Sequence, residues 1–176
     1  TGSIIAWFHR MIGEPDMASL NEEAAAIAPG ADGLVVLDHF QGNRTPFTDA
    51  ASRGCLNGLS LSHTRGHIFR ALMEGIGYGT ELILENFRTG GFTPSEMVIC
   101  GGATNSEPWM QIHADISNLP IIKTRVADAP ALGSAMLAGI CGGAFSSFEQ
   151  AADAMVQVER RIEPDPERHA VYRDLI

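Results

Sequence analysis

The amino-acid sequence predicts an α/β domain with a mixed sheet and helices on both faces, and three observations carry this prediction. Short apolar runs typical of strands alternate with longer segments in which apolar residues recur at helical spacing. The second half of the chain has the order strand–helix–strand–helix, which makes a parallel, right-handed βαβ unit. Two earlier strands, separated by a loop, are expected to pair antiparallel and to feed into the same sheet.

The first half of the chain contains two helices and two strands around a long loop. Ser3 is a suitable N-cap for the first helix, and Pro29-Gly30 ends the second. The loop contains Gly42 and Pro46, has little periodicity, and reaches the length at which loops tend to be functional. We expect helices over 4–12 and 16–28, strands over 34–37 and 54–59, and the loop over 41–53.

The longest helix is predicted over residues 63–88, followed by Gly90-Gly91. It contains Gly75, Gly77 and Gly79, each of which costs about 1 kcal/mol relative to Ala inside a helix. Three glycines on a strongly apolar helix predict close packing against neighbouring elements rather than weak helix formation.

The second half adds two strands and four helices. Apolar runs predict the strands, and helical spacing predicts the helices. In one of these helices Leu132, Met136 and Leu137 are expected to face inward. The elements are strands 97–100 and 121–124 and helices 106–118, 129–140, 148–156 and 165–175.

Composition narrows the function. A length of 176 residues suits one domain, and 45% hydrophobic against 19% charged residues speaks against disorder. The formal net charge of −9 argues against nucleic acid or an anionic membrane as a partner. A nucleotide phosphate can still bind, because backbone N–H groups supply local positive potential. The three cysteines are far apart, which predicts reduced thiols in a cytoplasmic protein and no metal site.

The turn after the strand 97–100 is the strongest candidate for a ligand site. Ligands of open α/β sheets bind beyond the carboxyl ends of strands. Gly101, Gly102 and Ala103 would let a phosphate or ribose approach the backbone there. Asn105 and Ser106 would cap the next helix or hydrogen-bond a ligand. Taken alone, this segment fits a plain tight turn better than a site.

Known nucleotide and hydrolase motifs are missing. The sequence has no G-x-x-x-x-G-K-[ST], no G-x-G-x-x-G after a strand and no G-x-S-x-G. Trp109 is expected to pack in the core; the alternative is that its ring stacks on a ligand. Asp115 is expected to make a structural hydrogen bond rather than to act as a base.

Two further clusters have a structural and a functional reading. His63 and His67 lie four residues apart, but no nearby carboxylate or cysteine completes a metal set, so capping or a surface position is expected. Arg44, Asp49 and Arg53 in the long loop would bind phosphate or sugar hydroxyls, or hold the loop together by ion pairs. The second reading is preferred.

Four segments occur in the order and at the spacing typical of one family. They are Gly42-x-Arg44-Thr45-Pro46-x-x-Asp49-x-x-x-Arg53-Gly54; Gly54-x-Leu56-x-Gly58-Leu59 followed by His67-Ile68-x-x-Ala71-x-x-Glu74; Gly101-Gly102-Ala103-x-x-Ser106-x-x-Trp109-x-Gln111-Ile112-x-Ala114-Asp115; and Ala131-Leu132-Gly133-Ser134-Ala135 followed by Gly142-Gly143-Ala144-Phe145. Together they resemble the C-terminal domain of the FGGY family of carbohydrate kinases over nearly the whole chain.

The resemblance implies a ribonuclease H-like, actin-like fold in which two lobes enclose ATP. The family's adenosine-side contacts carry over to Gly2, Ala6, Gly102 and Ser106, with Gly101, Ala103 and Asn105 as neighbours. The family's glycerol kinases have Gln at the position of Ala6 and Asn at that of Ser106. These departures, together with Trp109, resemble xylulose or sugar-alcohol kinases more closely.

The resemblance also implies what this chain lacks. The family's catalytic Asp, most sugar contacts and most Mg²⁺ contacts belong to the first lobe, so residues 1–176 are expected to form one C-terminal lobe without catalytic or metal-binding residues. Such a lobe would serve phosphoryl transfer from ATP to a ketopentose or polyol and would be inactive alone. The lobe face left bare is expected to favour a homo-oligomer. The alternatives are a glycerol-kinase-like lobe and a non-catalytic nucleotide- or partner-binding module.

Overall fold

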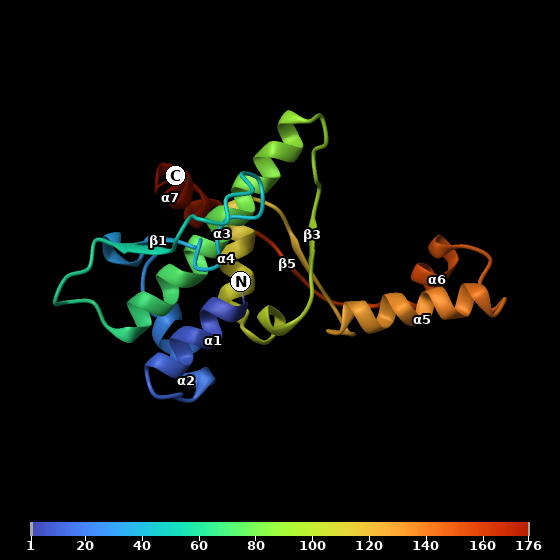
Figure 1. The fold of residues 1–176 in the computed structure, drawn as a ribbon, viewed down its shortest axis with the longest axis horizontal. Coiled ribbons are helices and arrows are strands. Elements are labelled where there is room, and N and C mark those ends of the chain that lie inside the picture. The colour runs from blue at the N-terminus through green and yellow to red at the C-terminus, as the bar shows by residue number, and fades with distance from the viewer. Residues whose placement is uncertain (1, 176) are drawn as a thin grey trace.

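The structure, a computed structural model, describes residues 2–175. Figure 1 shows the arrangement of its elements. The helices are α1 (Gly2–Met11), α2 (Met17–Ala25), α3 (Arg65–Thr89), α4 (Glu107–Ser117), α5 (Ala129–Cys141), α6 (Phe148–Met155) and α7 (Pro166–Leu175), with short 3₁₀ turns η1 (Ala31–Gly33) and η2 (Gly102–Asn105). The strands are β1 (Val35–Leu37), β2 (Cys55–Asn57), β3 (Met97–Ile99), β4 (Ile121–Thr124) and β5 (Val158–Ile162). Every predicted helix and strand is present, most of them slightly shorter than predicted.

The strands form two sheets rather than the single predicted one, and the second of them is mixed. β1 and β2 pair antiparallel as expected, but they form a sheet of their own. β3 and β4 pair parallel, which confirms the βαβ unit, and β5 adds an antiparallel strand beside β4. α4 packs against β4 and β5, whereas Val98 on β3 is 61% exposed. Among the described elements, the main helix contacts with this sheet come from α4, through Met110 and Ala114 against Ile121 and Ile162.

Strand β5 is absent from the predicted elements because it has no apolar pattern. Four of its five residues are exposed. Charged side chains hold it in place: Glu159 accepts a hydrogen bond from Lys123 at 2.9 Å, and Arg161 binds Glu96 at 2.7 Å. Pairing with β4 and these cross-strand contacts form the strand without hydrophobic alternation.

Helix α3 is the central element of the core and contacts α1, α2, α4 and β1. Its three glycines mark close approaches, as predicted. A Cβ on Gly75 would lie 2.5 Å from the Val36 carbonyl oxygen, and one on Gly77 would lie 2.5 Å from Ile116 Cδ1. Glycine at these positions lets β1 and α4 pack directly against the helix backbone.

Substituting Gly75 by Ala is expected to destabilise the domain despite the higher helix propensity of Ala. The neighbour is a strand carbonyl rather than the end of a flexible side chain, so only a backbone shift can relieve the clash. We expect this shift to lower the free energy of unfolding by about 1–3 kcal/mol. The matched control is Gly133→Ala on α5, where a Cβ meets nothing within 4 Å, and which is expected to stabilise by up to about 1 kcal/mol. Urea unfolding of the two variants measures the difference. Equal effects would contradict the packing role of Gly75.

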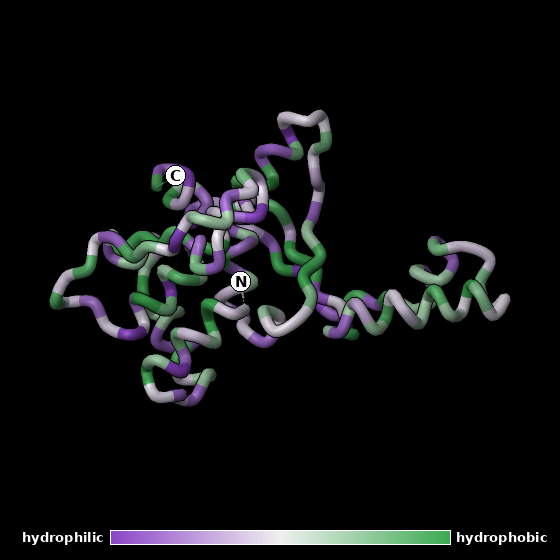
Figure 2. The backbone as a smooth tube through the Cα atoms, viewed as in Figure 1, coloured by the Kyte–Doolittle hydropathy of each residue, from purple (hydrophilic) through white to green (hydrophobic). Residues whose placement is uncertain are grey.

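Helix α5 corrects the prediction that Leu132, Met136 and Leu137 face inward. No residue of α5 is buried, and Leu137 is 52% exposed. In Figure 1 α5 and α6 project together from the rest of the molecule, and Figure 2 shows hydrophobic residues along them. Helical spacing locates an apolar stripe but does not say what covers it. Among the described elements, α5 packs mainly against α6.

The three cysteines are free and exposed, in agreement with the prediction of unpaired thiols. No helix within residues 2–175 combines the length and the apolar character that a membrane span requires.

Candidate functional site

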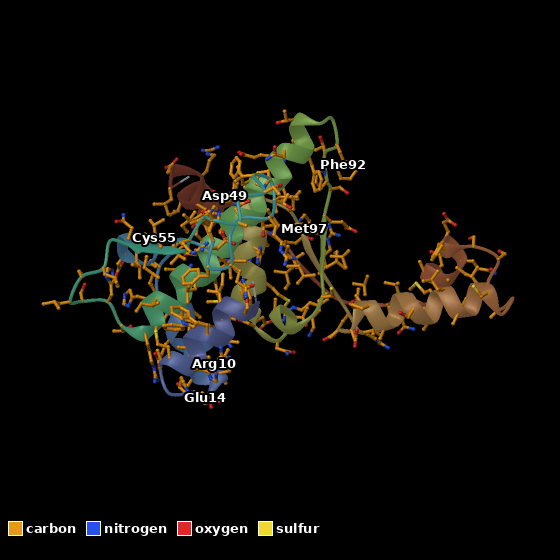
Figure 3. All side chains as sticks on the ribbon, viewed as in Figure 1. Arg10, Glu14, Asp49, Cys55, Phe92 and Met97 are labelled. Carbon is orange, nitrogen blue, oxygen red and sulfur yellow. The ribbon has the colours of Figure 1, made fainter. Side chains whose placement is uncertain are left out.

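A cavity of about 870 Å³ lies between α1, α2, the end of β3, η2 and the start of α4. Met97, labelled in Figure 3, contributes to its wall from β3. Six of the seven residues that the sequence suggested line this cavity, although they come from two segments about a hundred residues apart. They are Gly2, Ala6, Gly102, Ala103, Asn105 and Ser106.

The seventh residue, Gly101, shapes the turn. Its φ of +81° lies in the region that favours glycine, and its N–H donates to the Ala127 carbonyl at 3.0 Å. Its carbonyl accepts the Thr104 hydroxyl at 2.7 Å. The backbone conformation of the turn is therefore sufficient reason for glycine at position 101, and Gly101 does not line the cavity.

Gly102 and Gly2 differ from Gly101. Neither has a positive φ, and a Cβ at either position would meet nothing within 4 Å. A tight turn accounts for Gly101 but gives no reason for glycine at 102. Open space at both residues, on the cavity wall, leaves room for a ligand to approach the backbone closely.

Ser106 joins two helices at the cavity wall. Its hydroxyl accepts the Trp109 N–H at 3.3 Å, which confirms the predicted cap of α4. The same hydroxyl donates to Asn21 Oδ1 on α2 at 2.6 Å. Asn21 also lines the cavity, but it was not among the predicted site residues. Nothing in the local sequence signals a contact that spans 85 positions.

The apolar side of the cavity includes Trp109 and His113, whose rings stack with centroids 6.2 Å apart. Trp109 is 5% exposed, so the core-packing prediction is confirmed, and its ring still forms part of the wall. Its indole N–H has no hydrogen-bond partner among the described residues. Burial lowers the pKa of His113 to about 4, which keeps this imidazole neutral at pH 7.

The remaining candidates are structural. Asp115 accepts hydrogen bonds from Gln111 Nε2, the Asp165 N–H and Arg168 Nε at 2.8, 2.8 and 2.6 Å, which confirms its predicted role. His67 hydrogen-bonds Thr64 in the capping box of α3 and contacts Asp32 at 3.1 Å. Residues 2–175 contain no group of three or more His, Cys, Asp or Glu side chains suited to a metal ion.

The long loop is not held by ion pairs among Arg44, Asp49 and Arg53, so that prediction is wrong for the described contacts. Asp49 accepts two backbone N–H groups of its own turn, and Arg53 donates to three backbone carbonyls. Figure 3 labels Asp49 on this loop. Arg44 lines a second cavity of about 530 Å³ together with Asp38, whose carboxyl pKa burial raises.

Known proteins are similar to this chain in sequence and in fold. A family model described as the FGGY family of carbohydrate kinases, C-terminal domain, matches residues 1–141. The xylulose kinase of Bacillus subtilis is 34% identical over 175 residues, which cover 99% of this chain and 35% of that protein. Ribulokinase 2 of Staphylococcus saprophyticus is 36% identical over 158 residues, covering 89% of this chain and 29% of that protein. The crystal structure of xylulose kinase from Rhodospirillum rubrum, 35% identical, matches with a TM-score of 0.85 and covers 99% of this chain and 36% of that one.

The chain spans little more than a third of the length of two of these relatives. Its fold is the mixed α/β fold of the C-terminal lobe of such kinases, an actin-like ATPase fold. The family match covers the segments that form the cavity, from α1 to α4. The chain therefore belongs to the FGGY family of carbohydrate kinases and corresponds to the C-terminal domain of that family.

Proposed function

We propose that the chain is the nucleotide-binding lobe of a kinase that transfers the γ-phosphate of ATP to a hydroxyl of a ketopentose or polyol. The observation that carries this proposal is the pair of glycines, Gly2 and Gly102, that the fold itself does not require. Both line one cavity with an apolar side and a polar rim. Such a cavity suits a flat base at one end and a ribose or phosphate against the backbone at the other.

Different residues of the cavity would contact different parts of ATP. The N-terminus of α1 at Gly2 and the turn at Gly102 offer backbone N–H groups and a positive helix end to a phosphate or ribose. Ala6 and Ala103 leave space beside them, and Asn105 lies exposed at the rim. The described residues do not form a Mg²⁺ site, and we assign the metal that accompanies ATP to the other lobe.

The proposal assigns the catalytic carboxylate and most sugar contacts to a first lobe outside these residues. Phosphoryl transfer depends on positioning and charge stabilisation around the whole phosphate, so one lobe is expected to be inactive alone. A ketopentose is favoured as substrate because the relatives include xylulose kinases and ribulokinases. Steady turnover of ATP and a ketopentose by the 176-residue chain would contradict this division.

Substituting Gly102 by Ala in a kinase that carries this lobe tests the site. The added methyl group meets no protein atom within 4 Å, so the fold should tolerate it. A nucleotide pressed against the same backbone would not, and we expect the KM for ATP to rise about tenfold, the equivalent of about 1.4 kcal/mol. Gly133→Ala on the projecting helix α5 is the matched control and should leave the KM unchanged. An unchanged KM for Gly102→Ala would exclude close approach at this residue.

A further inference from the structure

The hydrogen bond between Asn21 and Ser106 determines which polar side chain at the cavity wall still has a donor to offer. Asn21 Nδ2 lies 2.8 Å from the Met17 carbonyl, which can only accept, so the amide nitrogen faces Met17. The amide oxygen therefore faces Ser106, at 2.6 Å from its hydroxyl oxygen. The two contacts therefore indicate the same orientation of the Asn21 carboxamide.

Ser106 has no proton left for a ligand. A hydroxyl carries one proton, and the Ser106 proton is donated to Asn21 Oδ1, since an amide oxygen cannot donate. The Ser106 oxygen also accepts the Trp109 N–H in the cap of α4. The hydroxyl thus connects α2 and α4 through hydrogen bonds and has no proton to donate to a ligand.

Asn21 retains one free donor. Its Nδ2 carries two protons, one of which is used by the Met17 carbonyl, and no described residue accepts the other. The side chain is half-buried and lines the cavity beside the apolar residues Met17, Phe69 and Trp109. In such surroundings a single hydrogen bond to a ligand contributes strongly to selectivity, because leaving a polar group unpaired is costly.

We propose that Asn21 determines base recognition: its free N–H donates to a ring nitrogen of the purine, and Ser106 positions it. The proposal rests on the proposed nucleotide function of this cavity. Purines present ring nitrogens that accept hydrogen bonds, which matches the free N–H of Asn21 beside the apolar side chains of Met17 and Phe69. Asn21 is thereby a ligand-binding residue supplied by α2, and Ser106 is its positioning residue.

Asn21→Asp separates base recognition from the structural bridge. Aspartate keeps an oxygen that accepts the Ser106 proton, but it removes the N–H. We measure dissociation constants by NMR titration of the 176-residue chain with ATP and, separately, with inorganic tripolyphosphate, which has no base. The added negative charge weakens both ligands, whereas loss of the donor weakens ATP alone by a further factor of about five to ten. Equal weakening of both ligands, or unchanged ATP binding, would overturn the proposal.

A rescue variant guards against a folding defect in Asn21→Asp. Ser106 and Asn21 meet at 2.6 Å, so Asn21→Ala combined with Ser106→Asn places a carboxamide at the same point and keeps a good N-cap. We expect this double variant to bind ATP more tightly than Asn21→Ala alone, and no recovery would count against the proposal. A native chain that shows no response to millimolar ATP would remove the proposed function and this inference together. A native chain that binds ATP as tightly as both Asn21 variants would remove the inference only.

Discussion

Replacing Glu74 by Ala is expected to reduce the free energy of unfolding by about 3–5 kcal/mol, the range for breaking a buried ion pair by removing one partner. Glu74 is 2% exposed, and its Oε1 accepts Arg70 Nε at 2.7 Å and the Tyr172 hydroxyl at 2.8 Å. The Gly30 N–H donates to the same oxygen at 3.1 Å. One carboxylate thus joins α3, α7 and the turn before η1.

The loss is large because Arg70 remains in the core without its counter-charge. Arg70 is 5% exposed, and its other nitrogens bind the Ala24 carbonyl and the Tyr172 hydroxyl. Burial raises the pKa of the Glu74 carboxyl, while the nearby Arg70 charge lowers it. These opposing effects mean that the cluster depends on keeping all of its members.

Urea unfolding monitored by circular dichroism measures this prediction, with Glu23→Ala as the matched control. Glu23 also pairs with an arginine, Arg65 at 2.6 Å, but that pair is on the surface. The control should leave the unfolding midpoint nearly unchanged, as expected for an exposed ion pair. Equal effects of the two substitutions would contradict the structural importance of the buried cluster.

Acid is expected to destabilise the domain through His113, which lines the cavity between α1, α2 and α4. Its pKa is about 4 in the folded chain because burial disfavours the imidazolium, against about 6.5 in an unfolded chain. A depressed folded pKa gives stability that is present above pH 6.5 and is lost as the pH falls toward 4. The difference amounts to about 3 kcal/mol over this window.

His113→Leu isolates the contribution of this one imidazole. The variant lacks the titrating group, so the pH dependence of its unfolding free energy between pH 7 and 4 should be flatter than that of the native chain. Subtracting the two curves removes the contributions of the carboxylates. Parallel curves would show that His113 does not titrate differently in the folded and unfolded chains.

The sequence predicted the features that depend on local residue patterns, such as helix ends, and the close contacts that require glycine. Helix caps such as Ser106, and glycines such as Gly75 that a neighbouring backbone requires, leave a direct trace in the residue order. The position of α5 and the separation of the two sheets could not be predicted in this way, because an apolar stripe does not show which element packs against it. β5 was missed for a related reason, since contacts between charged side chains replace hydrophobic alternation.

The candidate site divides in the same way. Gly102 and its neighbours were predicted because they follow a strand and repeat a family's motif order, and they line one cavity with Gly2 and Ala6. Asn21 was missed, since its contact with Ser106 exists only once α2 and α4 have packed together. Gly101 was also expected beside the ligand; it does not line the cavity, and its positive φ shapes the turn.

The central claim is that the cavity between α1, η2 and α4 binds ATP. A two-dimensional ¹H–¹⁵N NMR titration of the chain with ATP tests it most directly, because such spectra report weak binding residue by residue. We expect progressive shifts at the backbone amides of Gly102, Ala103 and Asn105 and at the Trp109 indole N–H, while the amide of Arg44 in the long loop stays constant. Shifts confined to the loop cavity at Asp38 and Arg44, or none at millimolar ATP, would contradict the claim.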